Sequence, residues 1–163
     1  MCLDFFFAAN LCPTVCTSEQ TCVGTVCINV GRLACTLTWS RPGDGDIVVT
    51  TPDNHIISYK NRGPSLNTSG GELDRDDLNG TGPENVYWSS NSTLPPAGTY
   101  YLCFEPYNIQ PLINLTNPIT VTYRVIRPVN NIIILTRTFF DVVQNQYSCN
   151  LTAPTLVGTF TYP

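Results

Sequence analysis

Eight cysteines in a chain of 163 residues constrain this sequence more than any other feature. An even number of cysteines is typical of disulfide-bonded proteins that fold in an oxidising compartment. A zinc site is disfavoured, because no C-x-x-C pair occurs and His55 is the single histidine of the sequence. Eight cysteines allow many pairings, so the sequence leaves the connectivity open. The cysteines predicted to form disulfides are Cys2, Cys12, Cys16, Cys22, Cys27, Cys35, Cys103 and Cys149.

Charged residues are sparse and unevenly placed. They make up 12% of the chain, against the usual quarter, and the net charge is −4. This composition gives no basic footprint for nucleic acid and no polybasic stretch for an anionic membrane. Eight of the twelve acidic residues lie between Asp44 and Glu84, whereas both ends of the chain are almost uncharged. The ends are therefore the parts that are buried most easily.

The chain begins with the apolar stretch MCLDFFFAANLC. A secretory signal peptide needs a basic start and about 7–15 apolar residues, but the first basic residue is Arg32 and the apolar run covers only Phe5–Ala9. The run is also far shorter than the roughly 20 residues of a membrane-spanning helix, so no membrane insertion is expected. We expect a mature N-terminus, or one that lacks its upstream residues, and interpret the stretch as a buried strand. The alternative is the frayed end of an incomplete sequence.

Strand patterns dominate the rest of the chain. No window keeps a period of 3.6 residues, and proline or glycine interrupts nearly every stretch. Short segments of alternating apolar and polar residues are separated by Pro, Gly and Asn turns, which predicts an all-β, antiparallel β-sandwich of Ig-like or jelly-roll-like type. The predicted strands are 33–39, 46–50, 55–59, 85–88, 98–105, 119–126, 132–140 and 155–162, with a strand-like segment at 21–30.

Two regions are expected. Residues 1–31 hold five of the eight cysteines, four of them spaced C-x3-C-x5-C-x4-C, and are predicted to form an extended, Cys-rich N-terminal arm. Residues 32–163 are predicted to form the sandwich domain.

The most informative block runs from Trp39 to Tyr101. It contains PGDGDIVV, TPDN, GGELDRDD, GPENVYW and PAGTY in that order. This order resembles a family of secreted β-sandwich domains, widespread in bacteria and long catalogued as a domain of unknown function, with the pattern PGDxDxxV, TPDG, GGxLDxD, GPENxxW and PAGTY. The resemblance covers about residues 35–126. It departs at Asn54, where the family usually has Gly, but Asn tolerates the left-handed conformation that such a turn needs.

The acidic residues of this block are candidate metal ligands. Calcium takes six to eight oxygen ligands from carboxylates and carbonyls, and the resemblance implies a structural calcium at these positions. The alternative interpretation is a set of solvated turn acids and Asx-turn caps. No cofactor is expected to be required, and a structural Ca²⁺ is the one candidate. The candidate ligands are Asp44, Asp46, Asp74, Asp76, Asp77 and Glu84.

Catalytic patterns are weak, and no enzymatic activity is expected. A glycosidase carboxylate pair is disfavoured, since no nucleophile arrangement accompanies the acids. With one histidine and no G-x-S-x-G motif, Ser-His-Asp or Cys-His catalysis is disfavoured too, and His55 is interpreted as an ordinary strand residue. The aromatic residues of the block are either a sugar-stacking platform or core, and their alternating positions favour core. They are Trp39, Trp88, Tyr100 and Tyr101.

Five N-x-S/T sequons are candidate glycosylation sites, a mild excess that fits a secreted protein. They begin at Asn67, Asn79, Asn91, Asn114 and Asn150.

Two functions remain open. In the first, the chain is a secreted subunit of an extracellular filament, and its N-terminal strand is donated to a neighbouring copy. The residues expected to make this contact are Leu3, Phe5, Phe6 and Phe7. The chain is also similar to protomers of helical extracellular fibrils recovered from environmental water. In the second, the chain is a calcium-dependent module that binds carbohydrate or a cell surface. The partners expected are further copies of the chain and, in the second case, glycans.

Overall fold

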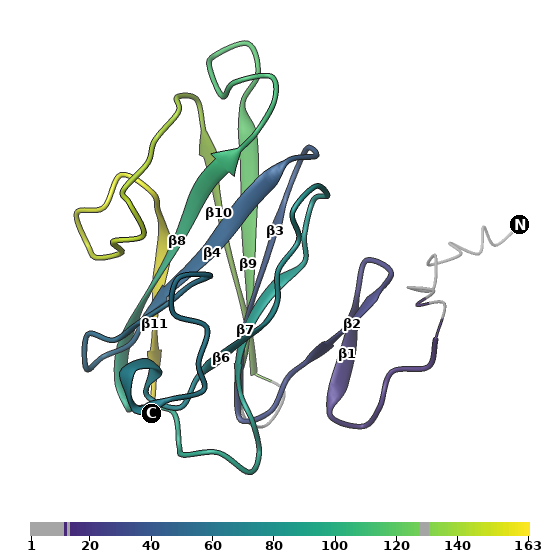
Figure 1. The fold of residues 1–163 in the computed structure, drawn as a ribbon, viewed down its shortest axis with the longest axis vertical. Coiled ribbons are helices and arrows are strands. Elements are labelled where there is room, and N and C mark those ends of the chain that lie inside the picture. Colours follow the sequence, from purple (N-terminus) through teal and green to yellow (C-terminus); the bar gives the residue numbers. More distant parts are fainter. Residues whose placement is uncertain (1–11, 13, 128–130) are drawn as a thin grey trace, which may run out of the picture.

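The computed structural model describes residues 12, 14–127 and 131–163, and their fold is an antiparallel β-sandwich (Figure 1). The first sheet has the order β10-β9-β3-β7-β6, and the second has the order β11-β8-β4-β5. The strands of the first sheet are β10 (Asn131–Phe139), β9 (Ile119–Arg127), β3 (Leu33–Trp39), β7 (Glu84–Trp88) and β6 (Glu72–Arg75). Those of the second are β11 (Leu156–Tyr162), β8 (Gly98–Asn108), β4 (Asp44–Thr50) and β5 (Ile56–Ile57).

The core lies between the two sheets. Alternate residues of β3, from Leu33 to Trp39, face inward and are at most 4% exposed. Trp88 meets Tyr100 edge to face, and Tyr100 stacks on Phe160, so aromatic rings connect the two layers. The prediction that Trp39, Trp88 and Tyr100 belong to the core is confirmed. These rings are therefore not an exposed sugar platform.

A second, smaller apolar cluster covers the outer face of the four-stranded sheet. The connection between β10 and β11 crosses this face, and its Tyr147, Cys149 and Ala153 pack on Val48 of β4. The disulfide between Cys103 of β8 and Cys149 fixes the connection to the sheet. The long segment 140–155 is therefore a covering layer and not a loose loop.

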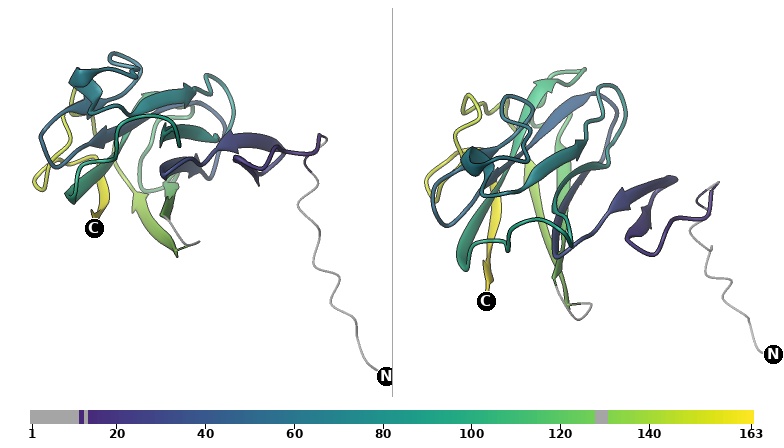
Figure 2. Two further views of the ribbon diagram at one scale, coloured as in Figure 1. Left: turned by 90° about the horizontal axis from the view of Figure 1, so that it is seen from below. Right: turned by 60° about the horizontal axis from the view of Figure 1, so that its bottom comes forward.

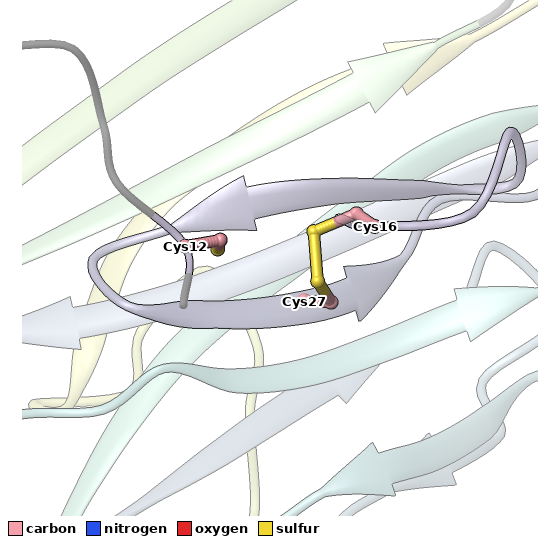
Figure 3. Close-up of side chains that lie close together, drawn as sticks. All are labelled: Cys12, Cys16 and Cys27. Carbon is pink, nitrogen blue, oxygen red and sulfur yellow. A yellow bond between two sulfur atoms is a disulfide. The ribbon is translucent and has the colours of Figure 1, made fainter. Parts of the chain in front are cut away.

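The Cys-rich region forms a hairpin of its own. Strands β1 (Gln20–Val23) and β2 (Val26–Asn29) pair antiparallel around a turn at Gly24, whose φ is +61°. Two disulfides, Cys12–Cys22 and Cys16–Cys27, join the hairpin to the segment before it; Figure 3 shows the second of them. The sulfurs of Cys12, Cys16 and Cys27 lie close together, but disulfide sulfurs are not the thiolates that a metal site needs.

The hairpin is attached to the sandwich at the β6 and β7 side of the first sheet, and most of it projects beyond the body (Figure 2). The side chain of Asn29 donates to Asp74 at 2.8 Å, and the side chain of Asn85 in β7 donates to the Asn29 carbonyl at 2.9 Å. Ile28 is 1% exposed. The described part of the arm thus rests on its own domain, and the apolar residues Leu3 and Phe5–Phe7 lie outside the described residues.

Most of the predicted strands are present, but three predictions were wrong. Residues 21–30 form two strands and not one, because Gly24 makes a turn between them. Residues 72–75 form the unexpected strand β6. Cys35 is not in a disulfide: it is a fully buried thiol on the inner face of β3, and burial raises its pKa. Cys2, which was also predicted to form a disulfide, lies outside the described residues.

The three disulfides indicate an oxidising, extracellular-type environment. Among the described residues, no helix has the length and apolarity needed to cross a bilayer.

Gly31, at the joint between the hairpin and β3, gives a test of the fold. Its φ is +45°, and an added Cβ would lie 2.0 Å from the Trp88 carbonyl oxygen, whereas a Cβ on Gly24 would meet nothing within 4 Å. Both substitutions to alanine carry the left-handed penalty of about 1 kcal/mol, but only Gly31→Ala also forces the backbone of β7 to move. In urea unfolding, Gly31→Ala should lower the free energy of unfolding by about 2–4 kcal/mol and Gly24→Ala by at most about 1 kcal/mol. Equal losses in the two variants would contradict this account of the joint.

Candidate functional site

A cluster of carboxylates lies where the starts of β4 and β7 meet the end of β6. One carboxylate oxygen from each of Asp46, Asp76 and Glu84 lies within 4.8 Å of the others. Asp44 lines the same hollow as Asp46 and Asp76. Four of the six predicted metal ligands are therefore brought together.

Two β-bulges produce this arrangement. One lies in β8, where Tyr107 is the extra residue opposite the step from Asp44 to Gly45 of β4, and the other lies in β6, where Asp74 is the extra residue between Leu73 and Arg75. A bulge re-aims the side chains next to it, and Asp76 directly follows the bulged end of β6. Gly45 is required at its position, because an added Cβ would lie 2.4 Å from the Phe104 ring.

Glu84 is the most deeply buried member, at 1% exposure. Its side chain crosses between the sheets: Oε2 accepts the Ile47 N–H of β4 at 2.5 Å, and Oε1 accepts the Asp77 N–H at 3.2 Å. Burial raises the pKa of Glu84 to about 10, against the opposing effect of the Ile47 N–H; the charges of Asp46 and Asp76 add to the rise. Without a cation, this carboxyl group is protonated at neutral pH.

Asp46 is 5% exposed and accepts a hydrogen bond at Oδ2 from the Tyr147 hydroxyl at 3.0 Å. Burial raises the pKa of Asp46 to about 7; the bond from Tyr147 opposes the rise, and the charges of Asp44, Asp76 and Glu105 add to it. The residue sits on the outer side of β4, beneath the covering segment 140–155 that supplies Tyr147.

Asp44 and Asp76 each have one oxygen that is buried and lacks a hydrogen-bond partner, namely Oδ1 in both. The other oxygen of Asp76 pairs with the Arg62 guanidinium at 2.8 Å. Burial, followed by the charges of Asp76 and Asp77, raises the pKa of Asp44. Buried carboxylate oxygens without partners are costly, and an all-oxygen donor set of this kind suits Ca²⁺. The residues present therefore fit a calcium ion.

Two of the predicted ligands have other roles. Asp77 shapes the turn before β7, since its carboxylate accepts the N–H groups of Gly80 at 3.1 Å and Gly82 at 2.8 Å. Asp74 accepts hydrogen bonds from Asn29 and Asn85 and so attaches the hairpin. Burial raises its pKa, and these two bonds oppose the rise.

The hollow above the cluster has a volume of 140 Å³ and is walled by Tyr59, Leu78 and Tyr107 as well as by the carboxylates. Tyr59 is 40% exposed and Tyr107 is 62% exposed. Sequence reasoning missed both rings, because neither stands in a motif: Tyr59 lies in the turn after β5, and Tyr107 is the extra residue of the bulge in β8. A site with oxygen ligands at its base and exposed aromatic rings at its rim has the chemistry to hold a cation and to contact a ligand beside it.

A larger hollow of 680 Å³ holds a serine, a histidine and an aspartate, which no sequence motif groups together. His55 Nδ1 lies 2.9 Å from Ser69 Oγ and 3.4 Å from Asp53. Ser69 also donates directly to Asp53, at 2.8 Å. A catalytic relay needs the imidazole between the hydroxyl and the carboxylate, with one ring nitrogen toward each; here a single nitrogen faces both. The arrangement instead fixes the turn at Asn54, whose φ of +64° agrees with the left-handed conformation expected there.

All five sequon asparagines are exposed and lie outside the strands of both sheets. Asn114 and Asn150 form Asx turns, each accepting the N–H and the hydroxyl of the threonine two residues later.

Comparison of the chain with protein-family models, with curated proteins and with solved structures gives no match. The site is therefore interpreted from its own geometry.

The raised pKa values predict the pH dependence of stability in the presence of a chelator. The unfolded Asp46 ionises near its ordinary pKa of 3.8 and the folded one at about 7, so its contribution to stability is complete below pH 4 and is lost as the pH rises toward 7. Asp46→Asn keeps a neutral acceptor for Tyr147. In urea unfolding with EDTA, it should be more stable than the wild type at pH 8 by on the order of 2 kcal/mol and equal to it near pH 4. The exposed Asp141→Asn is the control; a wild type that is most stable at pH 8 would contradict the prediction.

Proposed function

We propose that this protein is a secreted structural subunit that assembles into extracellular filaments by donating its N-terminal strand to a neighbouring copy. The docked, disulfide-bonded hairpin is the observation that supports the proposal. Its strand β2 contacts β6 and β7, and a disulfide joins Cys12 to Cys22 of its strand β1, so the eleven residues before Cys12 start from the hairpin. Those residues reach at most roughly 36 Å when extended, which is enough to contact a neighbouring domain.

Composition supports the same proposal. The segment carries Leu3 and Phe5–Phe7 and one charge, that of Asp4. A sandwich with open edges offers backbone groups for strand addition, in which main-chain hydrogen bonds give affinity and side-chain pockets give specificity. Because donor and acceptor are different surfaces, the contact is heterologous, and a heterologous contact whose rotation does not close a ring produces a filament.

Removal of residues 1–11 tests the proposal. The native protein, without reductant, should form long uniform filaments in negative-stain electron microscopy. The truncated protein should stay monomeric with an unchanged near-UV circular dichroism spectrum, because the sandwich and hairpin remain intact. Phe5→Asp/Phe6→Asp/Phe7→Asp should behave in the same way while keeping the length of the chain. Filaments from the truncated protein would refute donation by the N-terminal strand.

The carboxylate cluster favours a second, compatible function, calcium-dependent binding of a carbohydrate or a cell surface. Asp44, Asp46, Asp76 and Glu84 would hold the ion, and Tyr59 and Tyr107 flank it. When bound, the ion supplies positive charge to a buried acidic site and open coordination positions for ligand hydroxyl groups. Extracellular calcium modules work at about 10⁻⁴ to 10⁻³ M Ca²⁺, the range expected of a secreted protein.

Thermal unfolding at pH 7.5 measures calcium binding. At a Ca²⁺ concentration of about 100 times Kd, binding stabilises the native state by about 2.7 kcal/mol, which should raise Tm by about 5–10 °C for a chain of this size. Asp76→Asn should abolish most of the rise. Asp74 comes from the same sequence stretch but accepts hydrogen bonds from Asn29 and Asn85 where the hairpin is attached. The Asp74→Asn variant should therefore keep the calcium-dependent rise in Tm. No rise in the wild type, or equal losses in both variants, would refute the calcium site.

A further inference from the structure

The edge strand β10 has the features of an acceptor for an added strand. It pairs with β9 along its whole length without a register shift, from Asn131 to Phe139, and it is the last strand of its sheet. Within the described residues, no other strand pairs with its free side. It contains no proline and no bulge, and its one charged residue is Arg137, whose side chain donates to a carbonyl of β11; prolines, bulges and charges are the devices that usually protect an edge strand.

Apolar side chains stand on both faces of β10. Ile133 and Leu135 pack against the core, whereas Ile132 is 46% exposed and Ile134 is 57% exposed on the outer face. In the register of the sheet, Ile132 lies opposite Ile126 of β9. Exposed branched residues in a continuous, flat edge strand mark a site of strand addition.

The other three edges are less suitable. β5 has two residues, and β6 has four, a bulge and the hairpin strand β2 against it. β11 is interrupted by a register shift between Leu156 and Gly158. Two of its carbonyl groups, those of Leu156 and Thr161, accept the side chains of Arg137 and Arg127.

Charge and glycosylation also favour β10. Strands β9 and β10 carry Arg124, Arg127 and Arg137 and no acidic residue, whereas residues 1–11 carry Asp4 as their one charge. No sequon begins within β9, β10 or β11, so a sugar at any of the five predicted sites would be attached away from these strands. The hairpin is docked at β6 and β7, on the other side of the same sheet from β10.

We infer that the free edge of β10 is the acceptor for the N-terminal segment Leu3–Ala9 of a second copy, an inference that rests on the proposed filament function. The segment adds antiparallel or parallel to β10 as a sixth strand of the sheet, and its phenylalanine side chains cover Ile132 and Ile134. The hairpin that precedes the sandwich and the acceptor strand β10 lie on opposite sides of one sheet, so each copy binds one neighbour by its segment and another by β10. Where the rotation between neighbours does not close a ring, the contacts continue as a filament.

Complementation between two defective copies tests the inference. Ile132→Asp/Ile134→Asp changes two exposed positions and adds negative charge to an edge that should receive Asp4. This variant should be folded and monomeric, with the concentration needed for assembly raised at least about tenfold. The copy lacking residues 1–11 keeps the acceptor and loses the donor. The β10 variant and the truncated copy should each sediment as a monomer when alone. An equimolar mixture of the two should form a one-to-one heterodimer, because the β10 variant keeps an intact donor segment and the truncated copy keeps an intact acceptor strand.

A matched control uses the exposed leucines of the 680 Å³ hollow, Leu66 and Leu94. Leu66→Asp/Leu94→Asp should assemble like the wild type, whereas loss of assembly in this variant alone would place the acceptor in that hollow. Filaments from the β10 variant, with the truncated copy monomeric, would overturn the β10 inference and leave strand donation standing. A mixture that stays monomeric would also overturn it. Filaments from the truncated copy would overturn the proposed function itself, and the β10 inference with it.

Discussion

Neutralisation of Glu84 is the constraint on which the joined sheets depend. Its carboxyl group links the Ile47 N–H of one sheet to the Asp77 N–H beside the other, at a position that water hardly reaches. A buried carboxylate is tolerated only when it is protonated or when a positive charge lies beside it. Asp46 and Asp76 crowd the same place with further negative charge and make both requirements stricter. A proton or a cation would each relieve this charge, in addition to the two backbone N–H groups that the carboxyl group accepts.

These two routes connect the compartment to the fold. Under the proposed calcium binding, an extracellular environment rich in calcium would strengthen the joint between the sheets, and a calcium-poor environment would weaken it. The bulges in β8 and β6 serve this arrangement, because each departs from regular strand geometry beside the cluster, and the glycine at position 45 makes room there for the Phe104 ring. Irregularity concentrated at one place is typical of a site under functional constraint.

Period-two patterning predicted the sandwich because buried and half-buried residues alternate in strands such as β9. It failed at β6, where Glu72, Asp74 and Arg75 have the composition of a turn, although Leu73 enters the core. The site was predicted in part. Residue type alone identified six acidic residues as candidate metal ligands. It did not show that Asp76, which follows the bulge in β6, joins the cluster whereas Asp77 caps a turn. Tyr59 and Tyr107 were missed, since the first depends on where the turn after β5 lies and the second on a bulge in β8 that the sequence does not mark.

Cys35 is a built-in probe of transient opening of the sandwich. The thiol lies in the middle of the core, and its raised pKa keeps it protonated. Alkylating reagents attack the thiolate and need access to it, so Cys35 reacts only during excursions in which β3 separates from the opposite sheet. Peptide mapping of its labelling over time therefore gives the frequency of these excursions in the native protein, and in an assembled filament it would report how strongly neighbouring copies suppress them.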